Sequence, residues 1–258
     1  TRLGKVEFAL ASGDRLFRDK LAGEIADRVR TRHGATSAVV PILQLLGTAT
    51  AEDGSVRANR VQVNGVEQGF WQLAGGKPSI GQISPDGVAL NEPLARQLGA
   101  KVGDTILLRV PKPTQLSRDA PLAKEEDSSI AMRLKVHAIV ANGGLGRFSL
   151  QANQVAPFNA FVELKPLQSR LDATNGANIL IAARDKETDE LHDDSTWLNR
   201  MLPRALSKAW QFPDAQLDLL ELTNKVFELR TGRVFLDPPV VEAARKAASD
   251  ARLILTYF

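Results

Sequence analysis

The chain has 258 residues, with 33 Lys or Arg, 30 Asp or Glu and no Cys. A net charge of +3, without basic runs interleaved with aromatic residues, weighs against nucleic-acid binding. The absence of cysteine excludes disulfides, thiolate metal sites and cysteine nucleophiles. No stretch approaches the roughly 18–20 apolar residues that cross a bilayer.

The first third of the chain alternates helical and strand-like patterns. Residues 8–32 are predicted to be helix-rich, because four apolar side chains repeat every four residues: Phe17, Leu21, Ile25 and Val29. Ser37–Thr50 is predicted as a strand in which Pro41 implies an edge or a bulge. Val56–Leu73 is predicted as a hairpin around Asn64-Gly65, a strong hairpin-turn signal. The pair Phe70-Trp71 is expected to be core.

Residues 88–110 carry the clearest local pattern, a strand, a short helix, a turn and a second strand. Leu90, Leu94 and Leu98 recur every four residues and share one helix face. Asn91 is placed to cap the helix start, and Gly99 is placed to end the helix in a left-handed conformation. Gly103-Asp104 predicts a tight turn into the strand 105–110.

The rest of the chain alternates in the same way. Residues 111–129, rich in proline and charge, are predicted to be a mobile surface loop. The predicted strands that follow are 130–141, 158–164, 177–183, 217–222, 226–230, 233–236 and 253–258. Helices are predicted at 191–210, where Pro203 must kink or divide the helix, and after Asp237-Pro238-Pro239.

These elements predict an α+β fold of two subdomains. One is continuous, at 73–165, with Gly75-Gly76-Lys77-Pro78 at its boundary and the loop near 111–129 within it. The other is discontinuous and combines residues 1–72 plus 166–258. The smaller subdomain is therefore predicted to be inserted into the larger one.

The motif at 91–104 resembles a known family. Its residues Asn91, Leu94, Leu98, Gly99, Gly103 and Asp104 resemble the extracytoplasmic (periplasmic core) domain of MacB-type, FtsX-like ABC transporter permeases. Further stretches that are similar to this family are 57–71, 134–141, 158–164, 233–239 and 255–258. The individual motifs are packing patterns, and so their specificity is moderate.

The resemblance implies a porter-like subdomain interrupted by a smaller inserted α+β subdomain. It implies a non-enzymatic part of a bacterial transporter, without cofactor, at the periplasmic face of the inner membrane. The implied partners are the permease's own membrane helices, a second permease copy, a cytoplasmic ABC ATPase subunit and a periplasmic adaptor or lipoprotein. Because the chain begins at Thr1 without an initiator Met, we expect it to be an excised piece flanked by membrane helices.

Two enzymatic alternatives stay open. The pattern of Leu-Gly, Gly-Asp and a strand also occurs in cofactor-binding double-psi β-barrels of oxidoreductases, which would need residues 84–165 to close into one barrel. Arg32-His33-Gly34 resembles the phosphate-binding motif of histidine phosphatases, which would need His33 at a strand end facing a second histidine. Its position after an amphipathic helix favours a helix cap.

Other reactive-looking clusters have simpler explanations. Asn142–Arg147 is glycine-rich but lacks the Gly-Lys-Ser/Thr of a phosphate loop, and a turn is expected. Glu190, His192, Asp193 and Asp194 are expected to be a solvated helix start rather than a metal site. We therefore predict no catalytic, cofactor-binding or metal-binding residue in this chain.

Overall fold

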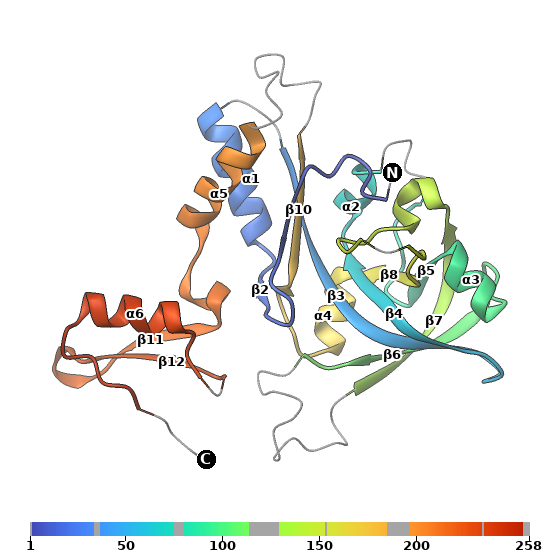
Figure 1. Cartoon of the computed structure of the whole chain (residues 1–258). Coiled ribbons are helices and arrows are strands. Elements are labelled where there is room, and N and C mark those ends of the chain that lie inside the picture. The colour runs from blue at the N-terminus through green and yellow to red at the C-terminus, as the bar shows by residue number, and fades with distance from the viewer. Residues whose placement is uncertain are drawn as a thin grey trace.

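A computed structural model describes residues 2–33, 37–74, 80–113, 129–152, 154–184, 197–233 and 235–254. Its centre is an eight-stranded sheet (Figure 1). Across the sheet the strands follow the order β1 (Phe8–Ala11), β10 (Ile179–Arg184), β3 (Ser37–Ala51), β4 (Arg57–Val66), β8 (Asn159–Glu163), β5 (Gly87–Asn91), β7 (Ser129–Val140) and β6 (Thr105–Pro111). The fold is mixed α and β, as the sequence predicts.

Six of these strands close into a barrel. From β4 the pairing runs through β8, β5, β7 and β6, and β6 pairs back to β3 from Thr48↔Arg109 to Ala51↔Ile106. One cluster of buried side chains draws on all six strands and on two short helices, α3 (Glu92–Leu98) and α4 (Leu164–Arg170). This cluster is the core of the barrel.

The other end of the sheet is a layered α/β structure. There β10 lies between β1 and the first part of β3, and both pairings are antiparallel. Helices α1 (Leu21–His33) and α5 (Trp197–Ala209) lie side by side next to β10 (Figure 1). The core of this layer includes all four repeating apolar residues of the predicted first helix, Phe17, Leu21, Ile25 and Val29.

An aromatic cluster fills the space between the barrel and the α/β layer. Helix α2 (Gln68–Gln72) places Phe70 with its ring centroid 5.0 Å from Trp71, 5.3 Å from Phe148 and 5.7 Å from Phe161. Phe70 and Trp71 are buried, which confirms the prediction that this pair is core.

The last part of the chain forms a separate small unit, which we call the C-terminal unit. It consists of η3 (Phe212–Ala215), β11 (Leu217–Glu221), η4 (Thr223–Lys225), β12 (Phe227–Thr231) and α6 (Pro238–Ala247). Strands β11 and β12 pair only with each other among the described residues. Figure 1 shows this unit to one side of the sheet, beyond α1 and α5.

The motif at 88–110 folds as predicted. The Asn91 side chain accepts a hydrogen bond from the Leu94 N–H at 3.1 Å, and Gly99 ends α3 with φ of 64°. Gly103 also has a positive φ, 98°, in the turn before β6. Each of these features depends on residues that are close in sequence. This explains why the local sequence pattern was sufficient to predict them.

Three predicted elements were wrong. The first helix begins at Leu21, because Phe17 and Arg18 instead form a short strand, β2, that pairs with β9 (Gly176–Ala177). No strand is present at residues 233, 235 and 236, and β12 pairs with β11 instead.

The predicted hairpin around Asn64-Gly65 is the third error, because β4 runs straight through this pair. The strand pairs there with β3 and β8. A Cβ at Gly65 would lie 2.8 Å from Leu167 Cδ2 of α4, so a larger residue there would require this side chain to shift.

Some predicted features fall on residues whose structure is not described. The boundary at 75–78, most of the loop 111–129, the start of the predicted helix at 191 and the residues 255–258 lie outside the described residues. The division into 1–72 plus 166–258 and 73–165 stays a prediction. Strand pairing crosses its limits, because β4 pairs with β8 and β3 pairs with β6.

A substitution at Gly47 tests whether β3 and β6 pair closely enough to close the barrel. A Cβ at this position would lie 2.5 Å from the Arg109 carbonyl oxygen of β6, a backbone atom that cannot rotate away. We expect Gly47→Ala to lower the free energy of unfolding by about 1–3 kcal/mol or more in urea titrations. In the control Gly23→Ala, the added methyl meets open space in α1, and we expect up to about 1 kcal/mol of stabilisation. Equal stabilities of the two variants would contradict the closure.

Candidate functional site

The residues that suggested phosphatase chemistry are not arranged for it. His33 is the last residue of helix α1, whereas the phosphatase alternative requires it at the end of a strand. His137 has an exposed side chain on β7. Gly34, Glu190, His192, Asp193 and Asp194 lie outside the described residues. Residues 142–146 form a turn in which Leu145 has a positive φ of 70°, as expected of a turn rather than a phosphate loop.

The double-psi alternative required residues 84–165 to close into one barrel. The strands of that segment form the open run β8, β5, β7 and β6, and closure needs β3 and β4 as well. Within the described ranges, no three His, Asp or Glu side chains are close enough together to hold a metal ion. None of the helices in those ranges is both long enough and apolar enough to cross a bilayer.

Polar groups instead gather at the joints between parts of the fold, and the first joint is built around Asn91. Its Nδ2 donates to the carbonyl oxygens of Gly146 at 2.9 Å and Pro157 at 2.7 Å. Its Oδ1 accepts from the backbone N–H groups of Leu94 and Asn159, each at 3.1 Å. The Asn91 residue is fully buried, and three of the four bonds are buried, whereas the bond to Pro157 is partly buried. Asn91 therefore fixes α3 to β8 and to the turn after β7.

A line of amides continues from this point to the α/β layer. Asn159 Oδ1 lies 3.4 Å from Asn64 Nδ2, and Asn64 Oδ1 accepts from Gln44 Nε2 at 2.8 Å. The Gln44 backbone in turn donates to Asn178 Oδ1 at 2.8 Å and accepts from Asn178 Nδ2 at 2.8 Å. We call these five residues, Asn91, Asn159, Asn64, Gln44 and Asn178, the amide chain.

The amide chain is a set of polar contacts that runs from the barrel to the α/β layer. At its far end, Asn178 Nδ2 also donates to the Gly13 carbonyl oxygen at 2.8 Å, in the loop between β1 and β2. All four asparagines are buried. A buried amide that lost its partner would cost about 1–3 kcal/mol, and so each link resists separation of the parts it connects.

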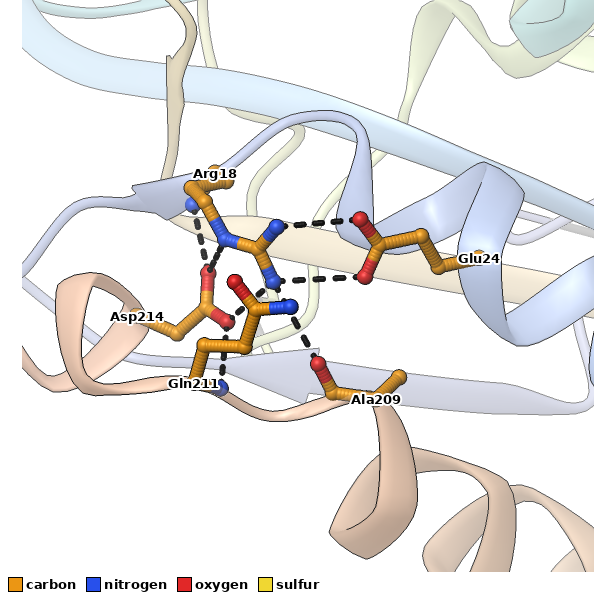
Figure 2. Close-up of polar contacts among 5 residues, drawn as sticks. All are labelled: Arg18, Glu24, Ala209, Gln211 and Asp214. Carbon is orange, nitrogen blue, oxygen red and sulfur yellow. Dashed lines mark hydrogen bonds and ion pairs between the residues drawn. The ribbon is translucent and has the colours of Figure 1, made fainter.

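A second joint fixes the C-terminal unit to the α/β layer (Figure 2). Arg18 of β2 donates to Asp214 of η3 from three nitrogens: its backbone N at 3.0 Å, Nε at 2.9 Å and Nη2 at 2.7 Å. Its guanidinium also donates to Glu24 of α1, at 2.9 and 3.2 Å, and to the Ala209 carbonyl oxygen at 3.3 Å. Asp214 Oδ2 accepts a further bond from the Gln211 backbone at 2.9 Å. We call these residues the Arg18 junction.

The Arg18 junction is largely shielded from water. The Asp214 side chain is 0% exposed and that of Arg18 is 13% exposed. The hydrogen bonds to Asp214, opposed by burial and joined by those to Glu24, raise the pKa of Arg18 above its ordinary value. The charges of Arg18 and Asp214 are therefore held together, and either one alone would be a poorly solvated charge.

A weaker contact lies beside this junction. Arg15 Nη2 donates to Asp237 Oδ1 at 2.6 Å, and Nη1 contacts the other carboxylate oxygen. Asp237 immediately precedes α6, so this pair ties the start of that helix to the loop before β2. The hydrogen bond from Arg15 lowers the pKa of Asp237. Both side chains are about one-third exposed, and pairs of this kind contribute little stability.

A third joint connects the α/β layer to α4. Asp19, buried just before α1, accepts from Lys165 Nζ at 2.6 Å and from Gln168 Nε2 at 2.8 Å. Gln168 Nε2 also donates to the Gly176 carbonyl oxygen of β9 at 2.8 Å. Burial acts to raise the pKa of Asp19, but the hydrogen bonds from Lys165 and Gln168 outweigh this effect, so that the pKa is lowered.

A cavity of about 300 Å³ opens beside α2 and α4. Its wall includes Glu67, Glu163 and Lys165 together with the Trp71 side chain. Partial desolvation raises the pKa of Glu67.

In the described part of the chain, buried polar groups thus gather at joints between parts of the fold. Sequence analysis singled out Asn91 only as a helix cap and missed the other members of the amide chain. A signal was available: Asn64 and Asn159 lie within strands, where asparagine is depleted, and an unpaired amide in a core is costly. Nothing in the sequence pairs Arg18 with Asp214, 196 residues later.

No protein-family model matches this sequence, and no curated protein matches it. Among solved structures, the chain is similar to the periplasmic region of MacB from Actinobacillus actinomycetemcomitans, with 10% identity over 97% of this chain and 96% of that one and a TM-score of 0.47. It is also similar to the extracellular domain of the noncanonic ABC-type transporter YknZ from Gram-positive bacteria. That likeness has 11% identity, covers 87% of this chain and 97% of the other, and has a TM-score of 0.45.

A substitution at Asp214 tests whether the Arg18 junction holds the C-terminal unit. In Asp214→Asn one carboxylate oxygen becomes an amide group that faces donors, and Arg18 loses its buried counter-charge. We expect the free energy of unfolding to fall by about 2–4 kcal/mol, with faster hydrogen exchange in β11 and β12. The control Asp218→Asn, at an exposed position of β11, should stay within about 0.5 kcal/mol of the unmodified chain. Equal effects of the two substitutions would show that the Arg18 junction does not hold the C-terminal unit.

Proposed function

We propose that this chain is the extracytoplasmic domain of a bacterial ABC transporter permease, and that it transmits motion rather than catalysing a reaction. The observation that carries the proposal is the segment 88–104. Its residues Asn91–Asp104 resemble the permease pattern, and the segment forms a strand, a helix and a turn in which the helix cap, Asn91, lies at the start of the amide chain. One residue of the resembling motif, Asn91, is thus part of a joint.

The shape of β3 supports a mechanical role. This strand of 15 residues pairs with β10 near its start and with β4 and β6 further along. At about 3.3 Å per residue it extends for roughly 50 Å through the α/β layer and the barrel. A displacement applied to one part would therefore be carried to the other by a hydrogen-bonded strand rather than by a flexible linker.

In this proposal the α/β layer, with β1, β10, α1 and α5, is the porter-like part, and the barrel contains the smaller inserted part. ATP binding and hydrolysis at a cytoplasmic ATPase subunit would move the membrane helices that flank this chain. The domain would follow as a connected body at the periplasmic face of the membrane. It would thereby export or extract a substrate, or act on a periplasmic adaptor or lipoprotein.

The proposal predicts the behaviour of the full-length gene product. We expect it to fractionate with the inner membrane and to co-purify with an ABC ATPase subunit in detergent. Asp214→Asn in that complex should reduce transport or substrate extraction more than it reduces ATP hydrolysis, because the membrane part is unchanged, whereas Asp218→Asn should alter neither. A full-length product that stays in the soluble fraction without an ATPase partner would contradict the proposed function.

A further inference from the structure

The hairpin of the C-terminal unit is an incomplete sheet. Strands β11 and β12 pair with each other, and within the described residues the outer edge of each has no partner strand. A lone two-stranded sheet is marginally stable in water, and an open edge is a template for another strand. The side chains of this hairpin also leave apolar surface exposed: Phe227 is 60% exposed and Leu219 is 47% exposed.

The charges on β12 specify what could pair with that edge. Glu228 and Arg230 are exposed and flank Leu229. If a second β12 lies antiparallel with Leu229 opposite Leu229, then Glu228 lies opposite the partner's Arg230 and Arg230 lies opposite the partner's Glu228. Two opposite-charge pairs result from one two-fold axis.

Other registers do not have this property. A shift that centres the axis on Glu228 or on Arg230 places like charges directly opposite each other. A shift by half a step places Leu229 opposite a charged residue, and a parallel in-register arrangement again pairs like charges. The sequence of β12 therefore selects the antiparallel register centred on Leu229.

The pairing within the hairpin extends this arrangement. Leu219 of β11 lies opposite Leu229, and Asp218 lies opposite Arg230. In a four-stranded sheet of two hairpins, a row of four leucines would lie on one face. The other face would carry Asp218, Arg230 and the partner's Glu228 in alternating sign. The edge of β11 does not form matching pairs in the same way. If a second β11 lay antiparallel with Leu219 opposite Leu219, then Leu217 would lie opposite the charged Glu221 of the other copy.

We infer that two copies of this chain associate through their β12 edges, antiparallel and centred on Leu229. The contact completes each hairpin to a four-stranded sheet and joins the two short apolar rows into one. An edge of five residues is small, so the dissociation constant is expected to be of order 0.1–1 mM for the free chain. The inference goes beyond the proposed function and is argued from the hairpin alone.

The absence of cysteine from the chain permits a direct test. Leu229→Cys places one thiol from each copy across the two-fold axis, at the separation of paired strand residues, and a covalent dimer should form on mild oxidation. Leu219→Cys is the matched control, because its two copies would be three strand spacings apart, about 14 Å. If Leu229→Cys crosslinks no faster than Leu219→Cys at the same protein concentration, the inference is overturned.

Charge exchange tests the register independently of crosslinking. Glu228→Arg and Arg230→Glu each turn two attractive pairs into repulsive ones, and sedimentation should show about tenfold weaker self-association. A mixture of the two variants restores opposite charges at both positions and should form a mixed dimer near the affinity of the unmodified chain. Two folded variants that associate no better together than alone would contradict the pairing, as would a monomeric unmodified chain at millimolar concentration. Neither result depends on membranes or on an ATPase.

Discussion

Strand β3 holds the α/β layer and the barrel together, because it pairs with β10 in one and with β4 and β6 in the other. Neither part can move away without breaking backbone hydrogen bonds along this strand. Its sequence fits both neighbourhoods: Val40 and Ile42 lie in the aromatic-rich cluster, while Leu43 and Ala49 lie in the barrel core. Pro41 is tolerated since β4 begins to pair with β3 only at Leu43.

The amide chain reinforces the same connection with directional bonds. A purely apolar contact between the barrel and the layer could slide, since the hydrophobic effect has no preferred geometry. Buried amides permit few alternatives, because a displaced donor or acceptor is left without a partner. The Asp19 contacts with Lys165 and Gln168 have the same effect on α4. Together these joints explain how a domain with two folded parts can act as one body.

The C-terminal unit is attached differently. None of the residues of α6 is buried, and the unit depends on the Arg18 junction and the contact of Arg15 with Asp237. A unit that is fixed by charge pairs and has open strand edges is better suited to a contact with another chain than to a role in the core. Several of its apolar side chains, such as those of Phe227 and Leu219, are exposed.

The sequence predicted the elements whose causes are local and missed those whose causes are distant. Asn91, Gly99 and Gly103 could be placed because caps and turns depend on adjacent residues. Asn64-Gly65 was misjudged as a turn, because its amide and its missing Cβ serve contacts with Gln44 and Leu167. Closure of the barrel through β3 and β6, and the pairing of Arg18 with Asp214, depend on residues far apart in sequence.

Native-state hydrogen exchange along β3 tests the central claim most directly. If the layer and the barrel are one body, the amides of Val40 and Ile42, which face β10, and those of Thr48 and Thr50, which face β6, should exchange with the same free energy. That free energy should equal the global value and exceed that of β11 and β12. Exchange of the β6 side at a distinctly lower free energy than the β10 side would show two independently opening parts and would contradict the account.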